Sequence, residues 1–323
     1  MLSLVRSHWF IVGLITVLTA ALVAPEWAPR LGRGQDLLFA AMFLATGLTL
    51  PGSALRGALT NLRFHAWVQG ISLVAFPLLG LGLDRTLALL GVDPHLRLGL
   101  LLTCCLPTTI SSCVQLTRLA GGDEAAAICT AALGNLLGIV LTPFWALLLA
   151  GSHLEVEPWP VVRQLLLIIA LPLAVGQALR PWLAAWATRH RTRLNTASTL
   201  ALLTAMWGIF AAAFRGGVSG LTPVGLGILI VGICVLFLLV LGGAWTLFGR
   251  LGFPPAQRIA GAICSTQRTA AMGLPVLSVL LAGDPALGLC LAPLVTWHIS
   301  QNVLTGLLTR RMQQTVNGAT APA

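Results

Sequence analysis

The chain has 323 residues, of which 57% are hydrophobic and only 9% charged, and its mean hydropathy is +0.91. Soluble domains carry about a quarter charged residues, so this composition excludes an ordinary soluble enzyme or nucleic-acid-binding protein. The formal net charge of +10 comes from Arg residues scattered along the chain. Because nucleic-acid binding needs a clustered basic face, no nucleic-acid partner is expected. The sequence predicts an all-α integral membrane protein.

Apolar runs of about 20 residues, the length that crosses a bilayer, alternate with short polar or Pro/Gly-rich breaks. Ten transmembrane helices are expected near 9–24, 35–50, 64–83, 96–119, 125–150, 161–179, 196–214, 224–248, 255–282 and 286–309. The first run also fits a cleaved signal peptide. Its removal would leave nine spans and destroy the symmetry described below, so we interpret it as a helix. Residues 313–323 are predicted to form a disordered C-terminal tail.

Orientation follows from the distribution of Arg between alternate loops. With the N-terminus inside, the cytoplasmic segments hold 12 Arg and the outer segments hold 6, whereas seven of the nine acidic residues lie outside. Cytoplasmic loops of membrane proteins carry the excess of basic residues. We therefore expect a multi-pass protein of the cell inner membrane with both termini in the cytoplasm.

The two halves of the chain match each other. Pairing the first five helices with the last five gives start offsets of 152, 161, 160 and, for the last pair, 161 residues, and Pro107 and Gln267 are 160 apart. Since five is odd, the second half must enter the membrane from the opposite side. The prediction is one membrane domain of two inverted five-helix repeats, 1–153 and 154–312, an architecture of many secondary transporters.

The fourth and ninth helices are expected to be broken and to cross. Pro107 removes a backbone donor within the fourth and disfavours the α conformation at Leu106. Breaks at matching positions of inverted repeats indicate a binding site near the membrane midplane. The candidate substrate- or ion-binding residues at the two breaks are Pro107, Thr108, Thr109, Ser112, Cys113, Ser265, Thr266, Gln267, Arg268 and Thr269.

Arg268 carries the most information, because an Arg at the centre of a span costs roughly 2.5–3.5 kcal/mol on insertion scales and should face a cavity or a partner. No span core holds a carboxylate to pair with it. We expect it to face a cavity, as the counter-ion of an anionic substrate or as a fixed charge in place of a coupling cation. The alternative is an Arg that extends to the membrane interface.

The fifth and tenth helices are expected to complete the lining. Their candidate residues are Thr130, Asn135, His298, Gln301 and Asn302. In the tenth, positions 298, 301, 302 and 305 share one helical face. The seven Cys lie in apolar stretches without a C-x-x-C pair, so disulfides and structural zinc are not expected.

Ten spans with broken fourth and ninth helices, the stretch PTTISSCVQLTRLAGGDEA and the stretch STQRTAAMGLPV together resemble the bile acid:sodium symporter superfamily, in particular its SBF-like CPA transporter branch. The similarity covers essentially the whole chain. It implies a core of helices that moves against a panel formed by helices 1, 2, 6 and 7. It also implies that Pro107 is the family's helix-breaking proline.

The resemblance further implies sodium-binding positions at Ser112 and Thr130, whereas Cys113 replaces an Asn of the motif. The sodium-binding Glu, Gln and Asn of the ninth helix align with Thr266, Ala270 and Ala271 here. Hard cations need several oxygen ligands, preferably with a charge among them. We therefore expect no two-sodium site and no confident metal site; if sodium binds, its ligands are Ser112, Thr130 and Thr266.

The leading functional prediction is a secondary active transporter of a small organic anion that works by alternating access. No cofactor is expected, and sodium or a proton is the candidate coupling ion. The alternatives are a non-transporting regulator of membrane ion flux, for example of calcium, a proton- or cation-coupled exchanger, and a channel. An intramembrane enzyme is not expected, because no nucleophile–base motif or acid pair occurs. The expected partners are membrane lipid and the substrate, for a monomer or homodimer.

Overall fold

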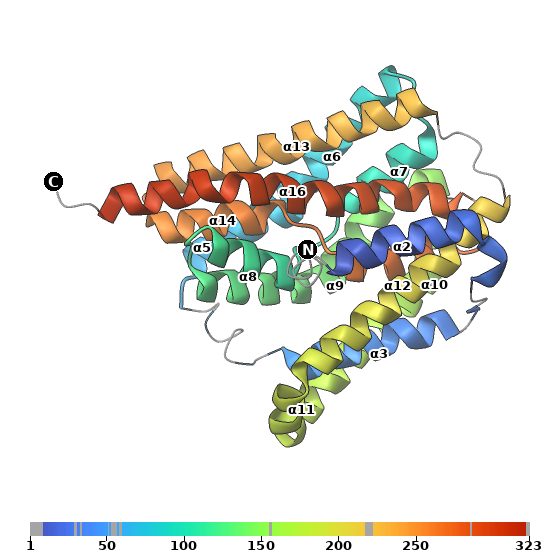
Figure 1. Cartoon of the computed structure of the whole chain (residues 1–323), viewed down its shortest axis with the longest axis horizontal. Coiled ribbons are helices and arrows are strands. Elements are labelled where there is room, and N and C mark those ends of the chain that lie inside the picture. The colour runs from blue at the N-terminus through green and yellow to red at the C-terminus, as the bar shows by residue number, and fades with distance from the viewer. Residues whose placement is uncertain are drawn as a thin grey trace. The chain divides into compact units, whose positions relative to one another are not determined.

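The computed structural model describes residues 9–28, 31–32, 34–50, 52, 57, 60–154, 157–216, 222–284 and 286–320. Every regular element in these residues is a helix (Figure 1). Arg6, Arg30, Arg33, Arg56 and Glu155, which entered the loop counts above, lie outside the described residues.

The helices of the first half begin and end close to the expected positions. They are α2 (Trp9–Val23), α3 (Gly34–Thr49), a continuous helix made of α5 (Leu62–Gly70), η2 (Ile71–Ala75) and α6 (Phe76–Leu89), then α7 (Pro94–Cys104), α8 (Ile110–Leu119) and α9 (Glu124–Leu154). A short 3-10 helix, Pro25–Trp27, follows α2. The expected fourth span is thus two short helices, as the proline predicts.

The second half shows the same succession. Its helices are α10 (Pro158–Leu165), η3 (Leu166–Ala170) and α11 (Leu171–Arg189) in one run, then α12 (Arg191–Gly216), α13 (Pro223–Arg250), α14 (Pro255–Thr266), α15 (Ala270–Leu280) and α16 (Leu287–Thr320). The expected ninth span is again two short helices. α16 continues to Thr320 and so occupies most of the stretch predicted as a disordered tail, because extending an existing helix needs no new nucleus.

Among the described residues, six helical segments are long and apolar enough to cross a membrane: Leu62–Leu89, Glu124–Leu149, Pro158–Arg189, Arg191–Arg215, Pro223–Arg250 and Leu287–Gln314. The remaining four expected spans are the shorter helices α2 and α3, with 15 and 16 residues, and the two interrupted pairs. The chain is therefore a multi-pass membrane protein. The full ten-span inverted repeat stays a prediction.

Two of the long helices contain a π-helical segment just before a proline. In η2 the amide of Phe76 donates to the carbonyl of Ile71, and in η3 the amide of Leu171 donates to that of Leu166. Pro77 and Pro172 follow directly, and each lacks an amide and crowds the carbonyl four residues back. The wider π turn accommodates the proline without ending the helix.

The helices form two compact units that each combine segments from both halves of the sequence. One comprises Met1–Leu50, Leu154–Leu221 and Leu274–Leu291, and the other Pro51–His153, Thr222–Gly273 and Ala292–Ala323. Besides Leu274–Leu291, which holds most of α15 and the start of α16, the first unit contains α2, α3, the α10–α11 run and α12, the first, second, sixth and seventh expected spans. These are the helices that the family resemblance assigns to the panel.

The first unit depends on a close approach of α3 and α11 (Figure 1). A Cβ at Gly47 would lie 2.4 Å from the carbonyl oxygen of Leu173, and a Cβ at Gly176 would lie 2.4 Å from that of Leu44. Nε2 of Gln177 donates to the carbonyl of Gly47 at 2.8 Å. Small residues at such crossings let two membrane helices pack backbone against backbone.

The second unit is held by aromatic packing and by α13 lying along α14. Trp297, which is 1% exposed, makes edge contacts with Phe76 and Phe237 at ring-centroid distances of 5.3 and 6.1 Å. Phe64 packs against Phe248 at 5.6 Å. These side chains join the α5–α6 run, α13 and α16 into one core.

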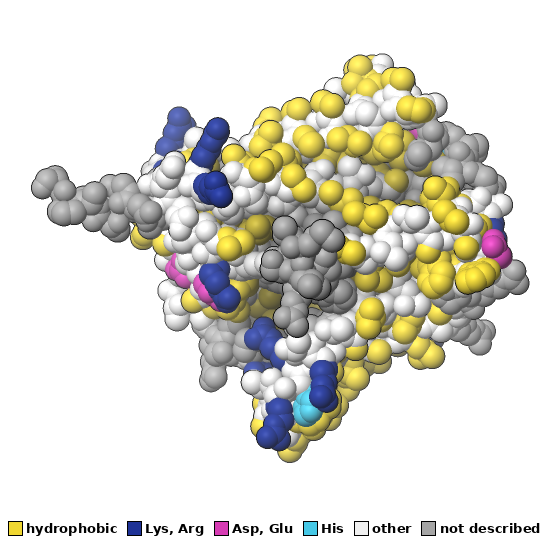
Figure 2. All heavy atoms as spheres, in the orientation of Figure 1, with side chains coloured by type: hydrophobic (Ala, Val, Ile, Leu, Met, Phe, Trp, Pro, Cys, Tyr) yellow, Lys and Arg dark blue, Asp and Glu magenta, His cyan; other side chains and the backbone are white. Residues whose placement is uncertain are grey.

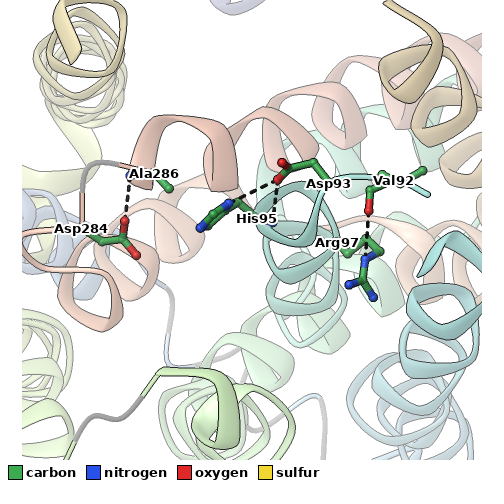
Figure 3. A network of polar contacts seen from close by, with 6 residues as sticks. All are labelled: Val92, Asp93, His95, Arg97, Asp284 and Ala286. Carbon is green, nitrogen blue, oxygen red and sulfur yellow. Dashed lines mark hydrogen bonds and ion pairs between the residues drawn. The ribbon is translucent and has the colours of Figure 1, made fainter. Parts of the chain in front are cut away.

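Acidic residues at the expected outer ends of the helices serve as local caps (Figure 3). Oδ1 of Asp93 accepts from the amide of His95 at 2.8 Å at the start of α7, and Nε of Arg97 donates to the carbonyl of Val92. In the other unit, Oδ1 of Asp284 accepts from the amide of Ala286. These carboxylates stabilise a helix start and a turn.

Exposed Arg side chains gather at helix ends that are expected to be cytoplasmic (Figure 2). Arg189, Arg191 and Arg193 are exposed where α11 meets α12. In the second unit, Arg250 ends α13 and Arg310 lies near the end of α16. The positive-inside orientation that the Arg count predicts stays a prediction.

Membrane topology can be tested directly. Cytoplasmic and extracytoplasmic reporter domains fused after Gln313 and near His153 should show the first position inside the cell and the second outside. The Arg count motivates this result. Both reporters on the same side would contradict the five-plus-five arrangement.

Candidate functional site

Two interrupted helices meet inside the second unit. Residues 105–109 separate α7 from α8, and residues 267–269 separate α14 from α15. The amide of Thr269 donates to the carbonyl of Pro107 at 3.0 Å, so the unwound segments are joined backbone to backbone. The two breaks predicted from the sequence therefore lie at one place.

In the first break, four consecutive backbone carbonyls lack helical hydrogen bonds, and each has another hydrogen-bond donor. The carbonyl of Cys105 accepts from Oγ1 of Thr142 at 3.0 Å, and that of Thr108 accepts from Nδ2 of Asn135 at 2.9 Å. The carbonyls of Leu106 and Pro107, which lie between them, accept from the second break. Non-helical backbone at membrane depth persists only when it is satisfied in this way.

Close packing keeps the first break in place. A Cβ at Gly138 of α9 would lie 2.6 Å from Cγ of Pro107, and a Cβ at Gly273 of α15 would lie 2.6 Å from Cδ1 of Leu106. Both glycines therefore allow the unwound segment to lie directly against neighbouring helices.

The second break has no proline at its centre and is held by one side chain of α16. Oε1 of Gln301 accepts from the amide of Arg268 at 2.7 Å, and Nε2 of Gln301 donates to the carbonyl of the same residue at 3.1 Å. Beside it, Nε2 of Gln267 donates to Oγ1 of Thr305 at 3.1 Å. The predicted polar face of the tenth span thus replaces the hydrogen bonds that the broken helix lacks.

The guanidinium of Arg268 is fully buried, with 0% exposure. Its Nη1 donates to Oγ of Ser72 at 2.7 Å and to the carbonyl of Leu106 at 2.8 Å, and its Nη2 donates to the carbonyl of Ser265 at 2.9 Å. Its Cζ lies 3.7 Å from the ring centroid of Phe76. The expectation of an open, cavity-facing Arg is corrected, because in this conformation the charge is enclosed by protein oxygens and an aromatic ring.

The other predicted residues divide between the break and its surroundings. Thr108 contacts Cys113 at 2.9 Å from Oγ1 to Sγ, and both are buried. Thr109 and Ser112 are half-buried at the start of α8. In α16, the ring Nδ1 of His298 lies 3.2 Å from Nε2 of Gln301. Nδ2 of Asn302 donates to the carbonyl of His298 at 2.7 Å within its own helix.

Two of the three positions that the resemblance relates to sodium ligands, Thr130 and Thr266, have protein partners here. Oγ1 of Thr130 forms a short hydrogen bond with Nδ1 of His65, and its carbonyl accepts from Nε2 of Gln69 at 2.9 Å. Oγ1 of Thr266 donates to the carbonyl of Ile263 at 2.9 Å. Among the described residues, no group of three or more His, Cys, Asp or Glu is placed to hold a metal ion.

Sequence reasoning missed the contribution of the third expected span. Its buried polar residues His65, Gln69 and Ser72 reach Thr130 and Arg268, and Phe76 lies under the guanidinium. The signal was present, because positions 65, 69, 72 and 76 follow the i, i+4, i+7, i+11 spacing of one helical face.

With this geometry in place, comparison with known proteins identifies the family. The model of the SBF-like CPA transporter family matches residues 8–314. The chain belongs to this family, a branch of the bile acid:sodium symporter superfamily. It is 32% identical to sodium/bile acid cotransporter 7 of Xenopus tropicalis over 95% of this chain and 92% of that protein. It is 30% identical to sodium/bile acid cotransporter 7 of Danio rerio, covering 98% and 97% of the two chains.

A bacterial relative, the putative symporter YfeH of Escherichia coli strain K12, is 29% identical over 94% of this chain and 92% of its own length. The family description and these names are those of transporters rather than of enzymes. The resemblance seen in the two broken-helix motifs is therefore confirmed, and the chain is a membrane transporter of this superfamily.

Proposed function

We propose that the protein is a secondary active transporter of a small organic anion, that it works by alternating access in the cell inner membrane, and that it lacks the usual two-sodium site. The observation that carries the proposal is the joining of two interrupted helices around Arg268. The residues proposed to bind substrate or ion are Pro107, Thr108, Thr109, Ser112, Cys113, Thr130, Asn135, Ser265, Thr266, Gln267, Arg268, Thr269, His298, Gln301 and Asn302.

The crossing is the place where the break at 105–109 meets the break at 267–269. The charge there supports an anionic substrate. Among the described residues, the guanidinium of Arg268 donates to one hydroxyl and two carbonyls and to no carboxylate, so neutral dipoles balance its positive charge. α8 and α15 both begin at the crossing, at Ile110 and Ala270, and helix N-termini carry partial positive charge. Nε of Arg268 is buried and has no protein partner within the described residues, so it keeps a donor for an anionic group once the site opens.

The division into two compact units supports alternating access. Such a cycle requires two bodies that move relative to each other around a fixed site. All proposed binding residues lie in the second unit, at 107–135, 265–269 and 298–302. The first unit then serves as the panel, and the substrate is carried by the unit that contains both breaks.

Transport should depend weakly or not at all on a sodium gradient. Thr266 replaces the expected carboxylate, and the hydroxyls of Thr130 and Thr266 already have protein partners. The measurement is substrate uptake into proteoliposomes with equal concentrations of sodium chloride or choline chloride outside. The substrate is first found by a thermal-shift screen of the purified protein against organic anions and cations. A steep, saturable sodium dependence would show that neutral ligands suffice.

The same preparation separates the alternatives. Accelerated exchange of labelled substrate when unlabelled substrate is present on the other side is expected of a transporter. Ligand binding without any exchange would instead favour the non-transporting regulator of ion flux. Uptake driven by a pH gradient alone would favour the proton-coupled exchanger.

A further inference from the structure

We propose that the guanidinium of Arg268 is a built-in cation: it occupies a small-cation site formed by the oxygens of Ser72, Leu106 and Ser265 and holds the two unwound segments together without an ion from solution. The inference deepens the proposed function, because its consequence for ion coupling rests on transport. The site itself rests only on the contacts described above.

The ligand set is one that a dehydrated monovalent cation can use. One hydroxyl and two backbone carbonyls lie 2.7–2.9 Å from the guanidinium nitrogens. Neutral oxygens of this kind take the place of water around dehydrated monovalent cations in proteins. The Phe76 ring, 3.7 Å from Cζ, closes one face and attracts a cation through its quadrupole.

The oxygens come from three separate segments of the chain. Ser72 lies in η2 of the third expected span, Leu106 in the first break and Ser265 at the end of α14. Leu106 and Ser265 belong to segments that are also joined by the bond from Thr269 to Pro107. Arg268 donates to all three oxygens, so its charge adds a further link between the two unwound segments and the third expected span.

The energetics support a structural charge rather than an incidental one. A fully buried charge is unfavourable unless hydrogen bonds and dipoles compensate for lost hydration. Here the side chain is 0% exposed, and three of its donors are used on these oxygens. A covalently attached cation is present at any sodium concentration, so closure of the crossing should not depend on sodium.

The test removes the charge and offers the vacated site to free cations. Purified Arg268→Ala is unfolded thermally in choline chloride, in sodium chloride and in a few millimolar guanidinium chloride at constant ionic strength. In choline, its Tm should fall by about 5–10 °C relative to the unmodified protein. Sodium or guanidinium should raise the Tm of the variant saturably by about 3–6 °C, as expected for a ligand that binds only the folded state. The unmodified protein should show no difference between sodium and choline.

A matched control exists on α14, the helix that ends just before Arg268. Arg258 of α14 also lies over an aromatic ring, 4.1 Å from the centroid of Trp245, and donates to a carbonyl at 2.7 Å. It lacks the three-oxygen arrangement. Arg258→Ala should therefore gain no cation response, which separates a specific site from a general effect of salt on a weakened protein.

Several outcomes would overturn the inference. No saturable response of Arg268→Ala to sodium or guanidinium would do so, as would a saturable sodium response of the unmodified protein. If Arg268→Ala does not fold, Arg268→Gln, which keeps the length but not the charge, is measured in the same way with the same criteria. If cations raise the Tm of Arg268→Ala but the unmodified protein transports nothing, this inference holds and the proposed function fails. If the protein transports substrate but cations do not raise the Tm of the variant, the proposed function holds and this inference fails.

Discussion

Replacing Arg268 with Gln is expected to lower the affinity for the transported anion about tenfold to hundredfold, because charge-assisted hydrogen bonds contribute about 1.5–3 kcal/mol. Gln keeps some donors but removes the positive charge that is enclosed at the crossing. Affinity is measured by thermal shift or equilibrium binding with the anion found by the ligand screen. The buffer contains choline, so that sodium does not replace the lost charge.

Two further variants sharpen this result. Arg268→Lys should recover only part of the affinity, since an ammonium group lacks the planar fork that reaches Ser72 and Ser265 together. Arg250→Gln is the control, because Arg250 is exposed at the end of α13. Wild-type affinity in Arg268→Gln would show that the residue stabilises the crossing and does not attract substrate.

Replacing Gly176 with Ala should strongly destabilise the unit built around α3 and α11. The added Cβ would lie 2.4 Å from the carbonyl oxygen of Leu44 and 3.0 Å from Cα of Gly47, and both are backbone atoms. Backbone cannot turn aside as a flexible side chain does, so the helices must separate. Overpacking of this kind costs about 1–3 kcal/mol or more, which predicts a Tm lower by roughly 3–10 °C.

The control for this substitution is Gly227→Ala in α13, where an added Cβ meets nothing within 4 Å. There the helix propensity of Ala should leave stability unchanged or raise it slightly. Equal Tm values for Gly176→Ala and the unmodified protein would mean that α3 and α11 do not approach as closely as the structure shows.

The sequence predicted the two helix breaks because their causes are local. Pro107 lacks an amide, and the polar run from Ser265 to Thr269 stands where a membrane span should be apolar. These local signals place both breaks within a few residues of their positions in the structure. They also identified Arg268 as an unusual charge.

What surrounds the breaks could not be predicted, because it depends on contacts between distant parts of the chain. Ser72 and Arg268 are 196 residues apart, and His65 and Thr130 are 65 apart. The expectation of a cavity-facing Arg assumed that a charge without a carboxylate must meet water or substrate. Instead, backbone carbonyls and an aromatic ring surround the charge, an arrangement that the pattern of side chains in the sequence does not reveal.

The interrupted helices also constrain how the protein is inserted during synthesis. α7, α8, α14 and α15 have 11, 10, 12 and 11 residues. At 1.5 Å per residue, each is only about half as long as the 30 Å hydrocarbon layer, so none can be inserted as a span by itself. The carbonyl of Leu106 precedes Arg268 by 162 residues and is synthesised first. The acceptor at Leu106 is therefore present before the charged segment of the late half is made, and a chain that ends before α14 lacks the donor that Arg268 provides to it.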